Sequence, residues 1–139
     1  MKAAVVYWSM SGNTEAMAEA VSEGIKEAGG EVDVITAGDF EASQINDYDS
    51  FVFGCPAMGS EELEEGEFEP MFESVEHELG DKKVVLFGSY GWGDGQWMRD
   101  WEARAQEEGI NLVSEPLIVN DAPDDDAIAE CKKLGASLI

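Results

Sequence analysis

The chain has 139 residues, enough for one domain with a full hydrophobic core, and we expect a single domain over residues 1–139. Aspartate and glutamate number 31 against 8 lysines and arginines, and the formal charge of -23 argues against binding to nucleic acid or to anionic membranes. No apolar stretch approaches the roughly 20 residues of a membrane span, and Cys55 and Cys131 have no spacing typical of a disulfide framework or a metal site. We therefore expect a soluble, cytoplasmic monomer whose macromolecular partners are basic.

Apolar runs typical of buried strands alternate along the chain with amphipathic segments typical of helices. In chain order the predicted elements are strand 2–7, helix 14–28, strand 32–36, strand 51–55, helix 69–79, strand 84–88, helix 96–108, a strand split around Pro116 into 112–113 and 117–119, and helix 124–138. In the first helix Met17, Val21 and Ile25 form one buried stripe, and Asn13 or Thr14 is suited to cap it. The alternation predicts an α/β fold, a parallel sheet with helices on both faces.

Doubly wound sheets bind ligands beyond the carboxyl ends of their strands, so the loops after the first, third and fourth strands are candidate binding loops. The first candidate loop, residues 9–14, contains hydroxyl and amide side chains, and Gly12 lets the backbone approach a ligand closely. The loop leads into a helix, whose free N–H groups suit a phosphate. It contains no lysine or arginine and lacks the Gly-Lys-Ser/Thr end of a P-loop, so neutral donors would hold the phosphate. The alternative is that these residues only cap the helix.

The other two loops carry apolar side chains where loop tips are ordinarily polar. Loop 55–61 contains Met58, whose thioether packs well against an aromatic ring. Loop 88–95 has four glycines around Tyr90 and Trp92, and an exposed indole is costly unless it covers a flat apolar group. The alternatives are a turn with Met58 folded onto the core and an indole that caps the core. Together the three loops describe a phosphate site beside an apolar slot, which matches the shape of flavin mononucleotide (FMN).

Segments 6–15, 54–59 and 86–93 resemble the flavodoxin family, specifically its short-chain members from anaerobic bacteria, and the helix that begins at Trp97 continues the likeness. The resemblance covers nearly the whole chain. It implies a flavodoxin-like doubly wound sheet of five parallel strands in the order 2-1-3-4-5, with FMN at the switch point. It also implies an electron carrier, not an enzyme, which shuttles electrons between redox proteins through one non-covalently bound FMN.

The resemblance assigns the cofactor contacts as well. It implies that loop 9–14 holds the phosphate with Met10 pointing to solvent, that Met58 and Trp92 cover the two flavin faces, and that Glu61 accepts a hydrogen bond from flavin N3–H. The implied cofactor-binding residues are Ser9, Met10, Ser11, Gly12, Asn13, Thr14, Pro56, Ala57, Met58, Gly59, Ser60, Glu61, Ser89, Tyr90, Gly91, Trp92 and Gly93. No catalytic or metal-binding residue is expected.

The resemblance further implies how the flavin potentials are set. In the family the peptide after the glycine at Gly59 can flip, and its carbonyl then accepts a hydrogen bond that exists only once the flavin is reduced to the semiquinone. Apolar walls and nearby carboxylates oppose the anionic hydroquinone, so the carrier is expected to work at low potential, mainly between semiquinone and hydroquinone. The acidic run 61–67 is expected to steer basic redox proteins to the site; the alternative is a solvated loop without a docking role.

Two other functions fit the sequence less well. A small FMN-dependent reductase of the quinone reductase type would need additional chain to build a substrate cavity. A response-regulator-like switch would need a phosphorylatable aspartate after the third strand, where this chain has Cys55 and Pro56. The single histidine, His77, lies in a predicted helix without a catalytic partner, and we expect it to have a surface or structural role.

Overall fold

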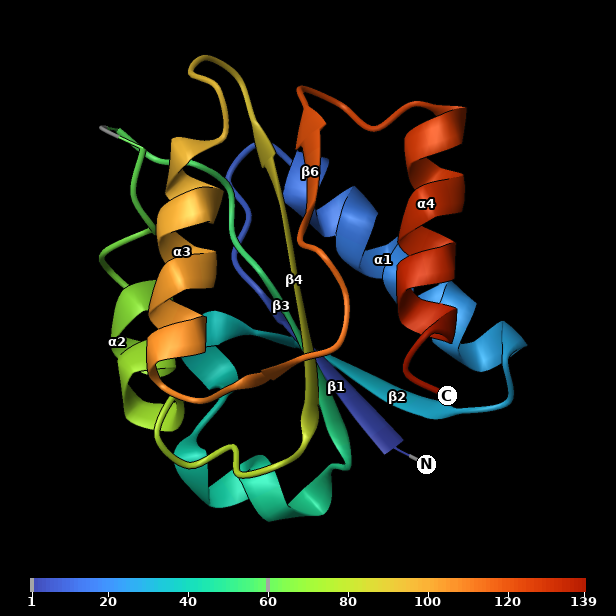
Figure 1. Cartoon of the computed structure of the whole chain (residues 1–139). Coiled ribbons are helices and arrows are strands. Elements are labelled where there is room, and N and C mark those ends of the chain that lie inside the picture. The colour runs from blue at the N-terminus through green and yellow to red at the C-terminus, as the bar shows by residue number, and fades with distance from the viewer. Residues whose placement is uncertain (1, 60) are drawn as a thin grey trace.

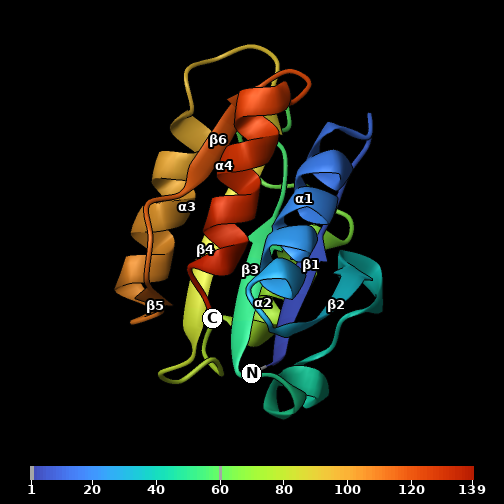
Figure 2. The ribbon, with the colours of Figure 1, turned by 90° about the vertical axis from the view of Figure 1, so that its right-hand side faces the viewer.

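The computed structural model describes residues 2–59 and 61–139. A parallel sheet runs through the centre of the molecule, with α1 and α4 on one face and α2 and α3 on the other (Figures 1 and 2). The elements are β1 (Lys2–Tyr7), α1 (Asn13–Glu27), β2 (Glu31–Thr36), η1 (Ala37–Asp39), η2 (Ala42–Asp47), β3 (Ser50–Gly54), α2 (Phe68–Val75), β4 (Lys83–Tyr90), α3 (Gln96–Glu107), β5 (Asn111–Leu112), β6 (Leu117–Asn120) and α4 (Asp125–Ala136). No helix within the described ranges is long and apolar enough to cross a membrane.

The strand order is β2-β1-β3-β4-β5, which confirms the expected doubly wound topology. The fifth position is divided, as predicted from Pro116: β5 pairs in parallel with residues 83–84 of β4, and β6 pairs in parallel with residues 87–90. Strand order reverses between β1 and β3, because the chain runs outward from β1 to β2 and then returns to the far side of β1. The carboxyl ends of β1, β3 and β4 therefore meet at the switch point, where such sheets bind ligands.

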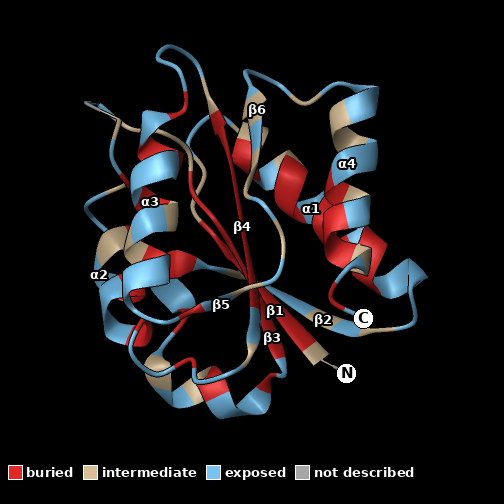
Figure 3. Cartoon of the chain, in the orientation of Figure 1, coloured by how far each residue is buried: buried red, intermediate tan, exposed pale blue. Residues whose placement is uncertain are grey.

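The three central strands are buried on both faces, as continuous apolar runs predict (Figure 3). On the α2 and α3 side, Phe72 and Trp101 meet edge to face with ring centroids 5.7 Å apart. On the other side Met17, Val21 and Ile25 of α1 are fully buried, which confirms the predicted stripe. These two apolar layers hold the strands in register and fix the positions of the loops that leave them.

The local structure differs from the prediction in two places. Helix α2 ends at Val75 and does not reach Leu79, because the chain tightens there: the N–H of Glu78 donates to the carbonyl of Val75, three residues back. Leu79 is nevertheless buried, as its place in the apolar stripe predicted. Segment 37–47, for which no element was predicted, forms two short 3₁₀ helices that bury Ile45.

Helices α1 and α4 approach so closely that two glycines are required between them. A Cβ added to Gly24 would lie 2.0 Å from the carbonyl oxygen of Lys132, and one added to Gly135 would lie 2.2 Å from that of Val21. Neither position can take a side chain unless the two helices move apart.

We expect Gly24→Ala to lower the free energy of unfolding by about 1–3 kcal/mol, since the strain of overpacking exceeds the helix propensity of about 1 kcal/mol that alanine adds. Urea denaturation measures the change. Glu19→Ala, at an exposed position of the same helix, is the control and should stay within about 0.5 kcal/mol of wild type. A Gly24→Ala protein as stable as wild type would show that the two helices are not in tight contact.

Candidate cofactor-binding site

Three loops begin side by side at the carboxyl edge of the sheet. Tyr7 at the end of β1 pairs with Gly54 at the end of β3, and Gly54 pairs with Phe87 of β4. The loops enclose a cavity of about 250 Å³. Its lining residues are Ser9, Met10, Ser11, Asn13, Thr14, Pro56, Ala57, Met58, Ser89, Tyr90, Gly91 and Asp121. All but Asp121 were predicted from the sequence.

The first loop is held by the hydroxyl of Ser9. Its Oγ accepts hydrogen bonds from the backbone N–H groups of Gly12 and Glu15, each at 3.2 Å. Gly12 is the N-cap of α1 at φ 93° and makes no side-chain cap, so the prediction that Asn13 or Thr14 caps the helix is wrong. Within the described part of the chain, the N–H groups of Asn13 and Thr14 have no hydrogen-bond partner. The loop therefore presents free donors at the positive end of a helix dipole.

Thr14 connects the first loop to the third. Its side-chain oxygen lies 3.0 Å from that of Ser89, and both residues are buried, with 1% and 5% of their surface exposed. A buried hydroxyl without a partner would cost about 1–3 kcal/mol, so this pair fixes the relative position of β4 and the start of α1.

The second loop is a tight turn closed at its base. Met58 and Glu62 form an antiparallel bridge, with N–H to carbonyl distances of 2.9 and 3.0 Å. Between them Gly59 has φ 44° and Glu61 has φ 56°, so the turn carries two left-handed residues. Ser60, also predicted to bind the cofactor, lies outside the described residues. The turn is anchored at both ends and brings the half-buried thioether of Met58 to the cavity.

Glu61 connects the second loop to the third. Its Oε1 accepts a hydrogen bond of 3.1 Å from the N–H of Gln96, in the first turn of α3. The side chain crosses Gly93, where an added Cβ would lie 2.6 Å from the same oxygen. Only glycine leaves room for this crossing.

The third loop carries an exposed aromatic ring, as predicted. Trp92 is 69% exposed, while the ring centroid of Tyr90 lies 5.5 Å from that of the buried Trp97. Met10, on the first loop, is 73% exposed, in agreement with its expected orientation. Gly12, Gly59, Glu61, Trp92 and Gly93 belong to the three loops but do not line the cavity.

The end of β6 and the residue after it were not predicted to reach the site. The side-chain amide of Asn120 donates to the carbonyls of Tyr90 and Gly91 at 3.2 and 3.1 Å, and the N–H of Asp121 donates to that of Tyr90 at 2.7 Å. Asp121 has φ 59° and lines the cavity. This position could have been predicted, because the second part of the split fifth strand runs parallel to β4 and therefore ends at the same edge of the sheet.

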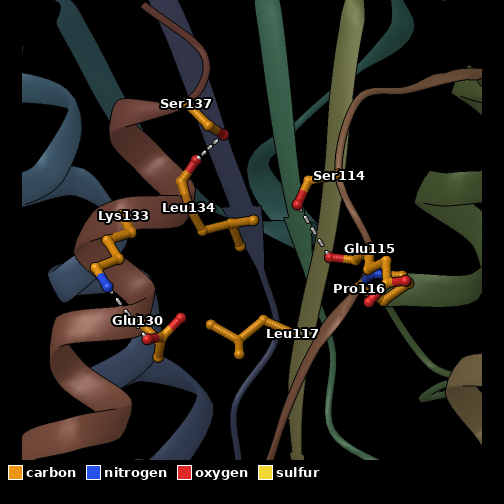
Figure 4. Close-up of a pocket in the computed structure, with 8 residues that line it drawn as sticks. All are labelled: Ser114, Glu115, Pro116, Leu117, Glu130, Lys133, Leu134 and Ser137. Atoms are coloured by element: carbon orange, nitrogen blue, oxygen red, sulfur yellow. Dashed lines mark hydrogen bonds and ion pairs between the residues drawn. The ribbon is translucent and has the colours of Figure 1, made fainter.

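A cavity of about 300 Å³ lies elsewhere, between α4 and the connection from β5 to β6 (Figure 4). Several of its polar side chains already have partners: the hydroxyl of Ser137 donates to the carbonyl of Leu134, and Lys133 lies 3.6 Å from Glu130. None of its residues belongs to the loops after β1, β3 and β4, so it does not compete as the site that the fold provides.

The acidic run 61–67 is not uniform. The carboxylate of Glu64 accepts hydrogen bonds from the N–H groups of Gly66, Glu67 and Phe68 at 2.6 to 2.8 Å, at the start of α2. Burial acts to raise the pKa of Glu64, but these three donors hold that pKa below its ordinary value. Glu64 is therefore part of the fold, whereas Glu62 and Glu65 are exposed.

Cys55 follows β3 directly and is buried beside the second loop. It is fully buried, and burial raises the pKa of its thiol to about 12. Cys131 is also buried and free, so both cysteines act as small apolar residues, as predicted.

A doubly wound parallel sheet with a hydroxyl-lined cavity at its switch point defines a nucleotide-binding α/β protein. The family model described as Flavodoxin matches residues 5–135. The chain belongs to the flavodoxin family.

The similar proteins agree with this assignment. The chain is 47% identical over 134 residues to a flavodoxin of Clostridium beijerinckii, covering 96% of each chain, and 45% identical over 131 residues to a flavodoxin of Megasphaera elsdenii, covering 94% of this chain and 93% of the relative. The solution structure of the two-electron reduced Megasphaera elsdenii flavodoxin matches with a TM-score of 0.90 at 44% identity, covering 98% and 97% of the two chains. Flavodoxins hold FMN and transfer electrons to redox partners, so this chain is an FMN-dependent electron carrier and not an enzyme.

The residues at the switch point fit this cofactor. Free N–H groups at a helix N-terminus suit the phosphate, and the cavity continues from them to the apolar side chains of Ala57 and Met58. Pockets that enclose a small ligand measure about 300–1,000 Å³, so this cavity suits a ligand that is only partly enclosed. An exposed edge is what an electron carrier requires.

Glu64→Gln should lower the free energy of unfolding by about 1 kcal/mol at neutral pH, because it removes the charge that holds the first turn of α2. The folded pKa of Glu64 lies below the unfolded pKa, so its contribution is present above the unfolded pKa and is lost as the pH falls through the folded pKa. The difference between wild type and variant should thus shrink below about pH 4. Urea unfolding across this pH range measures it, with the exposed Glu65→Gln as the control. Equal stability of the two variants at neutral pH would refute the capping role.

Proposed function

We propose that this flavodoxin is a low-potential carrier that binds its FMN in the switch-point cavity and exposes one flavin edge to basic redox proteins. The observation that carries the proposal is the continuity of one cavity from free helix N-terminal donors to apolar walls. The chain would work as one domain and as a cytoplasmic monomer, in keeping with its charge of -23.

The phosphate end of the cofactor would be held by loop 9–14. Ser9 fixes the loop through two N–H groups of its own chain, and this leaves Ser11, Asn13 and Thr14 to face the ligand. None of the residues that line the cavity is a lysine or an arginine. The grip would therefore come from oriented neutral dipoles, which bind an anion without adding a positive charge near the flavin.

The flavin ring would lie between Met58 and Trp92, with the remaining predicted residues Pro56, Ala57, Ser89, Tyr90, Gly91 and Gly93 around it. The exposure of Trp92 supports this, since a bare indole gains from covering a flat apolar surface. Glu61 keeps one carboxylate oxygen uncommitted beside its bond to Gln96, and that oxygen would accept the flavin N3–H. Ser60, which follows Gly59 in the sequence, would also contact the flavin.

FMN supplies one-electron chemistry when it is bound, and the chain sets the two steps. Gly59 at φ 44° can reorient the peptide that follows it at low cost, so a carbonyl would be available to the proton gained with the first electron. The second electron would add a negative charge, which the nearby carboxylates, among them Asp121, oppose. Arg99 does not relieve this, because its guanidinium is bound to Asp94 at 3.0 Å. The working cycle would use the second, low-potential step.

Titration of FMN-free protein tests the site. We expect FMN to bind with quenching of tryptophan fluorescence, and riboflavin, which lacks the phosphate, to bind at least about tenfold more weakly, a difference of about 1.4 kcal/mol. Ser9→Ala should weaken FMN binding by a similar factor and leave riboflavin binding nearly unchanged, because it disturbs only the phosphate loop.

The matched control is Ser43→Ala, which changes an exposed serine in η2 and should bind both FMN and riboflavin as wild type does. Equal affinities for FMN and riboflavin would contradict the phosphate assignment. Equal losses for both ligands in Ser9→Ala would show that the variant perturbs the whole site.

Electron transfer to a basic acceptor tests the docking surface. We expect Glu62→Gln with Glu65→Gln to slow reduction of a basic c-type cytochrome at low salt, and the difference to vanish at high salt, because steering by exposed charges is screened. Glu64 is left intact because it caps α2. The control, Glu31→Gln with Asp47→Asn, removes the same charge from the amino edge of the sheet. If the two double variants have equal rates, the acidic run has no docking role.

A further inference from the structure

The C-terminal ends of α2 and α3 meet at the end of α3 opposite to the cofactor cavity (Figure 1). Glu76 is the C-cap residue of α2 and is followed by His77, while Glu108 is the C-cap residue of α3. The Nδ1 atom of His77 lies 2.5 Å from Oε2 of Glu108. One ligand atom from each of Glu76, His77 and Glu108 lies within 4.8 Å of the other two. Three potential metal ligands thus converge from two helices.

The charge around this cluster is not balanced by the chain itself. Arg104 binds Glu76 through Nε at 3.0 Å and Nη2 at 2.6 Å, and binds Glu69 through Nη1 at 2.7 Å. Two carboxylates thus pair with one guanidinium, and Glu108 pairs with His77, so the four side chains other than His77 carry a formal charge of -2. The carbonyl ends of two helices add partial negative charge at the same place. A divalent cation would neutralise the cluster.

The donor set selects the kind of cation. An imidazole nitrogen beside carboxylate oxygens suits Zn²⁺, whereas Mg²⁺ and Ca²⁺ prefer oxygen ligands alone. Glu76 is 5% exposed, and each of its oxygens accepts one hydrogen bond from Arg104 and keeps a second lone pair. Glu108 and His77 are accessible, with side chains 30% and 63% exposed.

The geometry points to a Zn²⁺ site formed by Glu76, His77 and Glu108, with water completing the coordination, that clips the end of α2 to the end of α3. Arg104 accounts for the burial of Glu76, and the surface ion pair of His77 and Glu108 contributes little to stability, so replacing that ion pair by metal coordination costs little. The site does not depend on FMN, because none of its residues lines the cofactor cavity.

Titration of the FMN-loaded protein with ZnCl₂ tests the site. We expect one saturable Zn²⁺ per chain by calorimetry, at least tenfold weaker binding in His77→Asn and in Glu108→Gln, and a thermal midpoint that rises with Zn²⁺ in wild type but not in these two variants. The control Glu107→Gln removes an exposed acid from the same helical turn and should bind as wild type does.

The single histidine gives a second readout that needs no variant. The imidazole ring signals of His77 should shift on addition of one equivalent of Zn²⁺ and not on addition of Mg²⁺. Unshifted signals would overturn the proposal, as would a His77→Asn protein that binds Zn²⁺ like wild type. Either result would mean that the ion only associates with the acidic surface, and neither would bear on FMN binding.

Discussion

The parallel pairing of β1, β3 and β4 is the constraint on which the site depends. Because Tyr7, Gly54 and Phe87 lie in one row near the carboxyl ends of their strands, the loops after β1, β3 and β4 leave the same edge of the sheet. Two glycines leave room at this edge: a Cβ at Gly54 would lie 2.1 Å from the ring of Phe87, and one at Gly88 would lie 2.2 Å from the carbonyl oxygen of Cys55. The buried pair of Thr14 and Ser89 then locks the first loop to the third. None of the loops is a site alone, and each acquires its role from the other two.

Much of this architecture could be predicted from the sequence, because it rests on local patterns. Continuous apolar runs mark strands buried on both faces, and Pro116 marks the break in the last one. Features that depend on contacts between distant segments could not be predicted. The cap of α1 comes from Ser9, outside the helix, and the place of Asp121 in the cavity follows from its bond to Tyr90, thirty-one residues earlier. The role of Glu64 was hidden because a capping carboxylate and a solvated one look the same in an acidic run.

The electrostatics of the molecule follow one principle. A protein of charge -23 must bind a phosphate, and it does not surround the cavity with lysine or arginine. In the proposed site, backbone dipoles at a helix N-terminus would solve this locally, since they attract an anion without neutralising the surrounding field. In the proposed function, the field would remain available for two other tasks, to resist the second negative charge on the cofactor and to attract a basic partner. Replacement of the neutral loop by a basic one would strengthen the grip and remove both properties.

The salt dependence of FMN affinity tests this account most directly. If oriented neutral donors hold the phosphate within an acidic protein, screening removes more repulsion than attraction, and FMN affinity should hold steady or rise as salt is added. If cations hold the phosphate, affinity should fall with salt as screening weakens the attraction. A marked fall in FMN affinity at high salt would contradict the claim that uncharged donors hold the phosphate.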